Sequence, residues 1–123
     1  PASRWSSAYP LTATTGFNLF IKDAKGEWTW AASKAHRIVP NRKNLELLSK
    51  PLVIMNGVVK GEKECILYLP LFAELTSLEI GVNKSADIEK LANPFRHNIA
   101  VFGSSFTHGS CASGASINLS SNF

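Results

Sequence analysis

The sequence predicts a mainly β protein. Between residues 17 and 82, short apolar runs of strand length are separated by Gly, Asn, Asp and Pro, which is the pattern of strands joined by turns. One of these runs, residues 27–31, alternates apolar and polar side chains, as a half-buried strand does. Residues 98–123 differ in kind, because a continuous apolar run there leads into a loop rich in Gly and Ser. A length of 123 residues fits one domain, or one domain and a fragment of a second.

The composition is that of a folded protein, with 45% apolar and 18% charged residues. No run approaches the roughly 18–20 apolar residues of a membrane span. The net charge is +4, and the basic residues are scattered apart from Arg37, Arg42 and Lys43, so we expect no nucleic-acid partner. Residue 1 is Pro and no signal-peptide pattern follows it. We therefore expect the chain to begin after a processing site or at an artificial boundary.

The clearest local signal is a β-hairpin. Residues 17–22 and 27–31 are the two strands, and Gly26 supplies the positive φ that the turn between them needs. Trp28 and Trp30 are two residues apart in a strand, so they point to the same face. Two indoles on one face are either a platform that stacks on a sugar ring or ordinary core packing, and core packing is the more common case.

Further strands are expected between the turn-forming residues of the middle of the chain. Residues 33–50 are the most polar stretch, and Pro40 and Pro51 bracket the one segment in it that could make a helical turn, residues 44–48. We therefore expect a loop there with at most one short helix or strand. Pro70 lacks a backbone N–H and therefore belongs at a strand end. The expected strands are residues 51–55, 58–59, 65–69 and 77–82.

A polar connector, residues 83–95, divides the chain into two parts. Residues 1–97 form the predicted β domain, and residues 98–123 begin a second domain. Within the second part, residues 98–102 are apolar throughout, as in a strand buried on both faces. If this strand were instead exposed, its unpaired edge would seek a partner chain.

The two cysteines, Cys65 and Cys111, are far apart in sequence. No spacing pattern shows whether they pair, and we expect two separate buried thiols rather than a disulfide. Zinc-type C-x-x-C pairs are absent from the sequence. We therefore expect no metal site.

A buried strand that leads into a Gly-Ser loop is a common plan for the active site of an α/β enzyme. Here the loop begins with Gly103, Ser104 and Ser105. A serine in such a loop can be a nucleophile, with nearby backbone N–H groups as oxyanion donors. A simple Gly-Ser turn without chemistry explains the residues about equally well.

Residues 103–109, GSSFTHG, resemble the nucleophile block of SGNH (GDSL-type) serine hydrolases. That block has seven positions. The first is Gly, the second Asp, Ser or Thr, the third Ser and the fourth Ile or Leu. Thr, any residue and Gly follow. Residues 16–20, GFNLF, resemble the G-x-D-L-Y signature of a β-sandwich domain that precedes the catalytic domain in some of these enzymes, many from Bacteroides-type bacteria. Asn18 stands where the signature has Asp, Phe20 where it has Tyr, and Phe106 where the block has Ile or Leu.

This resemblance implies a jelly-roll-like β-sandwich accessory domain over residues 1–97, followed by the first strand and nucleophile loop of an α/β SGNH domain. Ser105 matches the nucleophile, and its own backbone N–H would donate to the oxyanion. No metal or organic cofactor is implied. The family's D-x-x-H pair has no counterpart here, and His36, His97 and His108 do not match its base.

The implied parent protein is a serine esterase acting on an acylated carbohydrate or a similar small ester, in the periplasm or outside the cell. Without a positioned base, the chain alone should have negligible activity, and the remainder of the catalytic domain would be its partner. The alternative is a non-catalytic β-sandwich that binds a glycan or a protein. In that case Trp28, Trp30 and Tyr68 are the candidate stacking residues.

Overall fold

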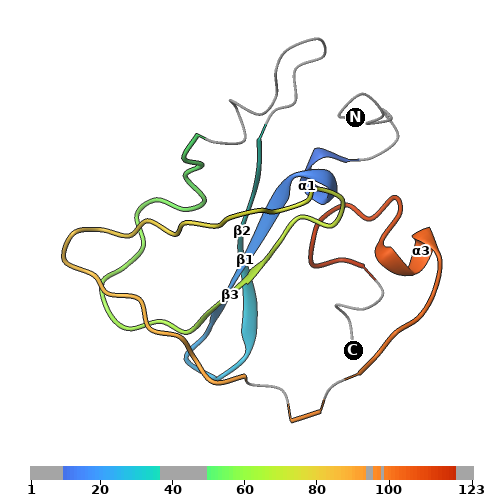
Figure 1. The fold of residues 1–123 in the computed structure, drawn as a ribbon. Helices are drawn as coiled ribbons and strands as arrows, with labels where there is room; N and C mark the ends of the chain where they lie inside the picture. Colours follow the sequence, from blue (N-terminus) through green and yellow to red (C-terminus); the bar gives the residue numbers. More distant parts are fainter. Residues whose placement is uncertain (1–9, 37–49, 94–95, 98, 119–123) are drawn as a thin grey trace.

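The computed structural model of the chain describes residues 10–36, 50–93, 96–97 and 99–118 (Figure 1). The sequence predictions for Arg37, Arg42, Lys43 and Asn98, and for most of the polar stretch 33–50, fall outside these residues. The described part contains two short helices and three strands. They are α1 (Leu11–Thr14), β1 (Gly16–Lys22), β2 (Trp28–Ala35), β3 (Cys65–Tyr68) and α3 (Ser105–His108).

The three strands form one antiparallel sheet in the order β2-β1-β3. The predicted hairpin is confirmed as β1 and β2. Its turn is held by Asp23, whose Oδ1 accepts hydrogen bonds from the backbone N–H groups of Lys25 at 2.8 Å and Glu27 at 2.9 Å. Gly26 has a φ of 86°, which a residue with a Cβ rarely adopts.

A β-bulge in β2 sets which side chains share a face. Leu19 pairs with Ala32 and Phe20 with Trp30, so Ala31 is the extra residue. Since paired residues point to the same side of a sheet, the predicted shared face of the two tryptophans is confirmed. This face carries Asn18, Phe20, Lys22, Trp28, Trp30, Ser33, Ile66 and Tyr68.

The other predicted strands are wrong for the described residues. Residues 51–55, 58–59 and 77–82 have no regular secondary structure. Hydrophobic pattern alone does not make a strand, because the backbone also needs a neighbouring strand to pair with. Among the middle segments, β3 pairs with β1. The described part is therefore mostly coil around a small open sheet, and no second sheet is present within it.

The expected buried strand before the nucleophile block is also wrong where the structure describes it. Residues 99–102 are without regular structure, and Ile99 and Phe102 are 66% and 93% exposed. Their apolar side chains find no sheet to cover them among the described residues. The expectation of buried thiols is wrong too, because Cys65 and Cys111 are both exposed, and both are free. Within the described ranges, no helix is long and apolar enough to cross a membrane.

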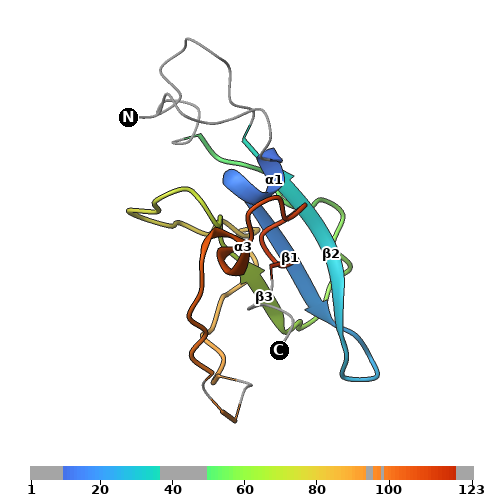
Figure 2. The same ribbon diagram turned by 90° about the vertical axis from the view of Figure 1, so that its right-hand side faces the viewer.

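The core is small and largely polar. Its buried members among the described residues come from α1, the turn after it, β1 and the segment after α3, and include only two apolar side chains, Ala13 and Ala115. The buried polar residues are Thr14, Thr15, Asn18, Ser116 and Asn118. In both views the C-terminal segment, drawn in red, lies beside α1 and β1 (Figures 1 and 2). The segment that follows the nucleophile block thus lies next to the buried first half of β1.

Candidate functional site

The predicted nucleophile, Ser105, is the first residue of α3 and is exposed. Ser104 before it has extended backbone angles, with a φ of −90° and a ψ of −165°. The chain therefore turns sharply from an extended residue into a helix at the predicted nucleophile. The first N–H groups of a helix have no acceptor within that helix. The backbone N–H of Ser105 stands at such a position, which suits the predicted oxyanion donor.

Position 103 must be Gly because α3, the helix that follows, lies very close to its backbone. A Cβ at this position would lie 2.0 Å from the Oγ1 of Thr107 and 2.6 Å from its Cβ. Any larger residue would push α3 away from the chain that leads into it. The first glycine of the block therefore has a steric reason that does not depend on catalysis.

The last glycine of the block, Gly109, ends α3. It has a left-handed φ of 105°. Its N–H donates to the Phe106 carbonyl at 3.0 Å, and the N–H of Ser110 donates to the Ser105 carbonyl at 2.7 Å. These two bonds form a Schellman motif. The backbone of Ser105 is consequently held from the far end of its own helix.

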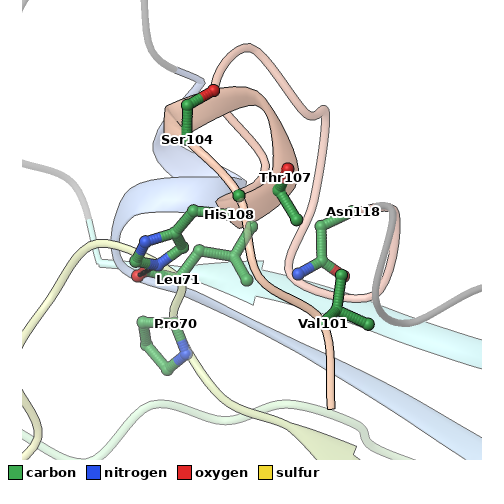
Figure 3. Close-up of a pocket in the computed structure, with 8 residues that line it drawn as sticks. Pro70, Leu71, Val101, Ser104, Thr107, His108 and Asn118 are labelled. Carbon is green, nitrogen blue, oxygen red and sulfur yellow. Dashed lines mark hydrogen bonds between the residues drawn. The ribbon is translucent and has the colours of Figure 1, made fainter. Parts of the chain in front are cut away.

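A pocket of about 440 Å³ lies beside α3, between the nucleophile block and the chain just after β3 (Figure 3). Ser104, Thr107 and His108 contribute to its wall, whereas Ser105 itself does not. Among the residues that the structure describes, no Asp, Glu, Lys or Arg side chain lines it. Its lining residues are Pro70, Leu71, Val101, Gly103, Ser104, Thr107, His108 and Asn118.

His108 binds the backbone rather than the predicted nucleophile. Its Nε2 lies 2.5 Å from the carbonyl oxygen of Leu71, so this nitrogen donates the hydrogen bond and carries the proton. Its ring stacks on Phe72, with centroids 4.7 Å apart and planes at 16°. A protonated Nε2 held by a carbonyl cannot take a proton from a serine. Sequence reasoning missed this contact, because Leu71 and His108 are distant in sequence and nothing in their spacing links them.

The other histidines lie elsewhere. His97 is exposed in a bend, and the carbonyl of His36 accepts a hydrogen bond from the hydroxyl of Thr15 at 3.3 Å. In the part of the chain that the structure describes, no three His, Cys, Asp or Glu side chains gather as metal ligands would.

The candidate stacking residues occupy one sheet face but two different strands. The ammonium group of Lys22 lies 5.5 Å from the ring centroid of Trp28, whereas Trp30 is 57% exposed. Tyr68 packs its ring edge-on against Phe20, with centroids 5.5 Å apart. Since β1 separates β3 from β2, Tyr68 is a whole strand away from the two indoles. Glycan binding by these residues stays a prediction.

Comparison with known families matches the part of the chain that contains the three-stranded sheet. Residues 3–88 match the family model described as GxDLY, the N-terminus of SGNH-hydrolase-type esterases. The chain belongs to the GxDLY family. The matched residues include Gly16–Phe20, the first residues of β1, which resemble the motif that gives the family its name. The match ends before the nucleophile block. No curated protein and no solved structure gives a significant match to the chain.

Proposed function

We propose that this chain is the N-terminal part of an SGNH-type serine esterase and that Ser105 is its nucleophile. Membership of the GxDLY family supports the esterase context. The observation that carries the residue assignment is the exposed position of Ser105 at the sharp turn from an extended residue into α3. We further propose that residues 1–97 belong to a β-sandwich accessory domain and that residues 98–123 begin the catalytic domain.

In the proposed reaction, a base removes the proton from the Ser105 hydroxyl as its oxygen attacks the ester carbonyl. The backbone N–H of Ser105 donates to the oxyanion that forms. The alcohol leaves with a proton from the same base, and water then hydrolyses the acyl-enzyme. Nε2 of His108 is held by Leu71, and His108 does not match the position of the family's base, so we place the base outside this chain. The remainder of the catalytic domain supplies it, as a D-x-x-H pair, and no metal or organic cofactor takes part.

The surface around Ser105 supports such a partner. Phe102 and Phe106 flank the serine in sequence and are 93% and 78% exposed. Apolar side chains this exposed are normally covered by another part of a protein. We propose that the rest of the catalytic domain packs on them, which leaves the opposite side of the block for the sheet domain.

The pocket beside α3 supports an uncharged substrate. Its wall combines hydroxyl and amide groups with Pro70, Leu71 and Val101, and has no charged carboxylate, ammonium or guanidinium group. Such a lining suits a neutral ester of an acylated carbohydrate or of a similar small alcohol. We propose that the enzyme acts in the periplasm or outside the cell.

The test compares the 123-residue chain with the product of the gene read beyond the codon for Phe123, using p-nitrophenyl acetate. We expect negligible hydrolysis by the chain and clear hydrolysis by the longer product. Ser105→Ala should lower kcat of the longer product by about 10³-fold or more, whereas Ser104→Ala, which removes the neighbouring hydroxyl, should have a much smaller effect. The proposal fails if the longer product hydrolyses the ester equally well after Ser105→Ala, or if the reading frame stops after Phe123.

A second candidate function is glycan binding by the sheet face, and the exposure of Trp30 beside Trp28 is the observation that favours it. Titration of the chain with acylated and unacylated oligosaccharides should then quench tryptophan fluorescence. Trp30→Ala should abolish the quenching. Equal quenching in the Trp30→Ala variant would reject this face as the binding site.

A further inference from the structure

The polar residue of the GxDLY motif is buried, and both its amide nitrogen and its amide oxygen form hydrogen bonds. Asn18 is 2% exposed. Its Nδ2 donates to the Oγ of Ser116 at 2.7 Å, and its Oδ1 accepts from the Oγ of Ser33 at 2.8 Å. Ser33 lies opposite Asn18 on β2, whereas Ser116 lies in the segment after α3. One side chain therefore joins the hairpin to a segment almost a hundred residues away.

The segment after α3 is shaped to fit against Asn18. A Cβ at Gly114 would lie 2.8 Å from the Asn18 Nδ2, so no larger residue fits there without a shift. Ala115 and Ser116 are buried. The hydroxyl of Thr12 in α1 donates to the carbonyl of Ser113. Small residues thus let residues 113–116 approach β1 closely enough for direct side-chain bonds.

This docked segment is continuous with the end of the nucleophile helix. The Schellman motif closes at Ser110, and the N–H of Ala112 donates to the Gly109 carbonyl at 2.9 Å. Gly109 also packs closely against Asn118, since a Cβ on the glycine would lie 2.8 Å from that of Asn118. Displacement of residues 113–118 would therefore disturb the bonds that end α3 and hold the carbonyl of Ser105.

A second tie runs through the segment after β3. His108 donates to the Leu71 carbonyl at 2.5 Å, and the N–H of Leu71 donates to the carbonyl of Ala13 in α1 at 3.0 Å. His108, the last residue of α3, is thus linked to α1 through Leu71. The Asn18 tie holds the chain beyond that helix, so the two ties restrain the block at different points.

We infer that Asn18 is a positioning residue for Ser105: it fixes the nucleophile block by holding residues 113–118 on β1. The inference rests on the proposed function of Ser105. It also gives a physical reason for a carboxylate or amide at this place in the GxDLY motif. Ser33 and Ser116 both carry hydroxyls that can donate, so Asp could accept from both, whereas an apolar residue could bond neither.

The first test is hydrogen exchange on the full 123-residue chain, with peptides from residues 103–118 compared with peptides from β1. Asn18→Ala should speed exchange in residues 103–118 by about tenfold or more, the effect of losing a buried hydrogen bond. Asn18→Asp should keep the exchange of the parent chain. Asn56→Ala is the matched control, because Asn56 is an exposed asparagine, and it should change nothing.

Ser116→Ala keeps the test decisive if Asn18→Ala fails to fold. It removes the same hydrogen bond from the side of the docked segment and leaves the hairpin intact, so exchange should again rise in residues 103–118 and not in β1. Unchanged exchange in residues 103–118 would overturn the inference. An equal rise in β1 would also overturn it, because Asn18 would then act as a general core residue.

Catalysis gives the second readout, in the longer gene product. Asn18→Ala should lower kcat with little change in KM, and Asn18→Asp should restore it. The exchange experiment does not depend on the chemistry of Ser105. If Ser105→Ala left hydrolysis intact, the proposed function would fail while the exchange result still reported the docking. If Ser105→Ala abolished hydrolysis and Asn18→Ala changed neither exchange nor kcat, only the inference would fail.

Discussion

Replacing Gly109 with Ala should destabilise the nucleophile block for two separate reasons. The residue has a φ of 105°, and a left-handed backbone costs a residue with a Cβ about 1–2 kcal/mol. The added methyl would also lie 2.8 Å from both the Asn118 Cβ and the Leu71 Cδ1. Overpacking of this kind typically costs a further 1–3 kcal/mol or so. We expect a total loss of about 2–5 kcal/mol from the two causes.

Gly26→Ala isolates the first cause. Gly26 has a similar φ of 86°, but its Cβ would meet nothing within 4 Å. It should therefore cost only the backbone penalty of about 1–2 kcal/mol. The loss of unfolded-chain entropy on changing Gly to Ala is similar at the two sites, so it cancels from the comparison. The difference between the variants, about 1–3 kcal/mol, measures how tightly Gly109 is packed.

Urea unfolding of both variants gives this difference. With a slope of about 1–3 kcal/mol per molar urea, the midpoint of Gly109→Ala should lie clearly below that of Gly26→Ala. Hydrogen exchange locates the effect, which should appear in residues 103–118 for Gly109→Ala and in the hairpin for Gly26→Ala. Equal midpoints for the two variants would refute the close packing of Gly109 against Asn118 and Leu71.

Three further predictions concern the sheet. Asp23→Ala removes the acceptor of two backbone N–H groups in the hairpin turn and should cost about 1 kcal/mol by urea unfolding, whereas Asp23→Asn, which keeps the acceptor, should cost less. Glu64→Gln breaks the partly exposed 2.7 Å ion pair with Lys22 and should cost less than about 1 kcal/mol. Although Cys65 is exposed, partial desolvation of its thiol raises its pKa above 9.0, and the positive charge of Lys63 opposes this shift. Iodoacetamide should thus modify Cys65 more slowly at pH 8 in the folded than in the urea-unfolded chain, and the stability that the thiol contributes below pH 9.0 should be lost as the pH rises through its higher folded-state pKa.

The hairpin could be predicted from the sequence because all its determinants are local. Alternation over residues 27–31 gave the shared face of Trp28 and Trp30, and the turn residues gave the positive φ at Gly26. The bulge at Ala31 could not be predicted, because it appears only once the register with β1 is known. Local pattern therefore predicted the hairpin and its turn, but not the register in which its two strands pair.

The strands that were predicted beyond β3 did not form, although their local pattern favours a strand. Residues 77–82 alternate as a strand should, yet Ile80 and Val82 are exposed in coil. Residues 99–102 are apolar enough for a buried strand, and they are exposed as well. A strand needs a partner for its backbone and a surface for its side chains. Neither is available to these segments within the described residues, and no feature of their own sequence could indicate this.

The segment after α3 carries little pattern in the sequence, yet it is among the most buried parts of the site. Its small polar residues are poor helix formers. In the structure, Gly114 and Ser116 meet Asn18, because residues with little side chain can approach a sheet closely. The run of small residues just after the nucleophile block could have predicted this contact, because small side chains are needed where two segments pack closely.

The polar nature of the core bears directly on how the proposed nucleophile, Ser105, is held. Apolar burial scales with the area removed from water, and the buried apolar side chains in the described part are those of Ala13 and Ala115. A core of this size cannot fix a distant loop by apolar packing alone. Hydrogen bonds can, because each demands a particular distance and direction. The position of Ser105 should therefore respond to the loss of a single hydroxyl, such as that of Ser116, more strongly than to the loss of a methyl group elsewhere in the sheet. Hydrogen bonds thus join β1 to the segment that follows the nucleophile block, although the two are far apart in the sequence.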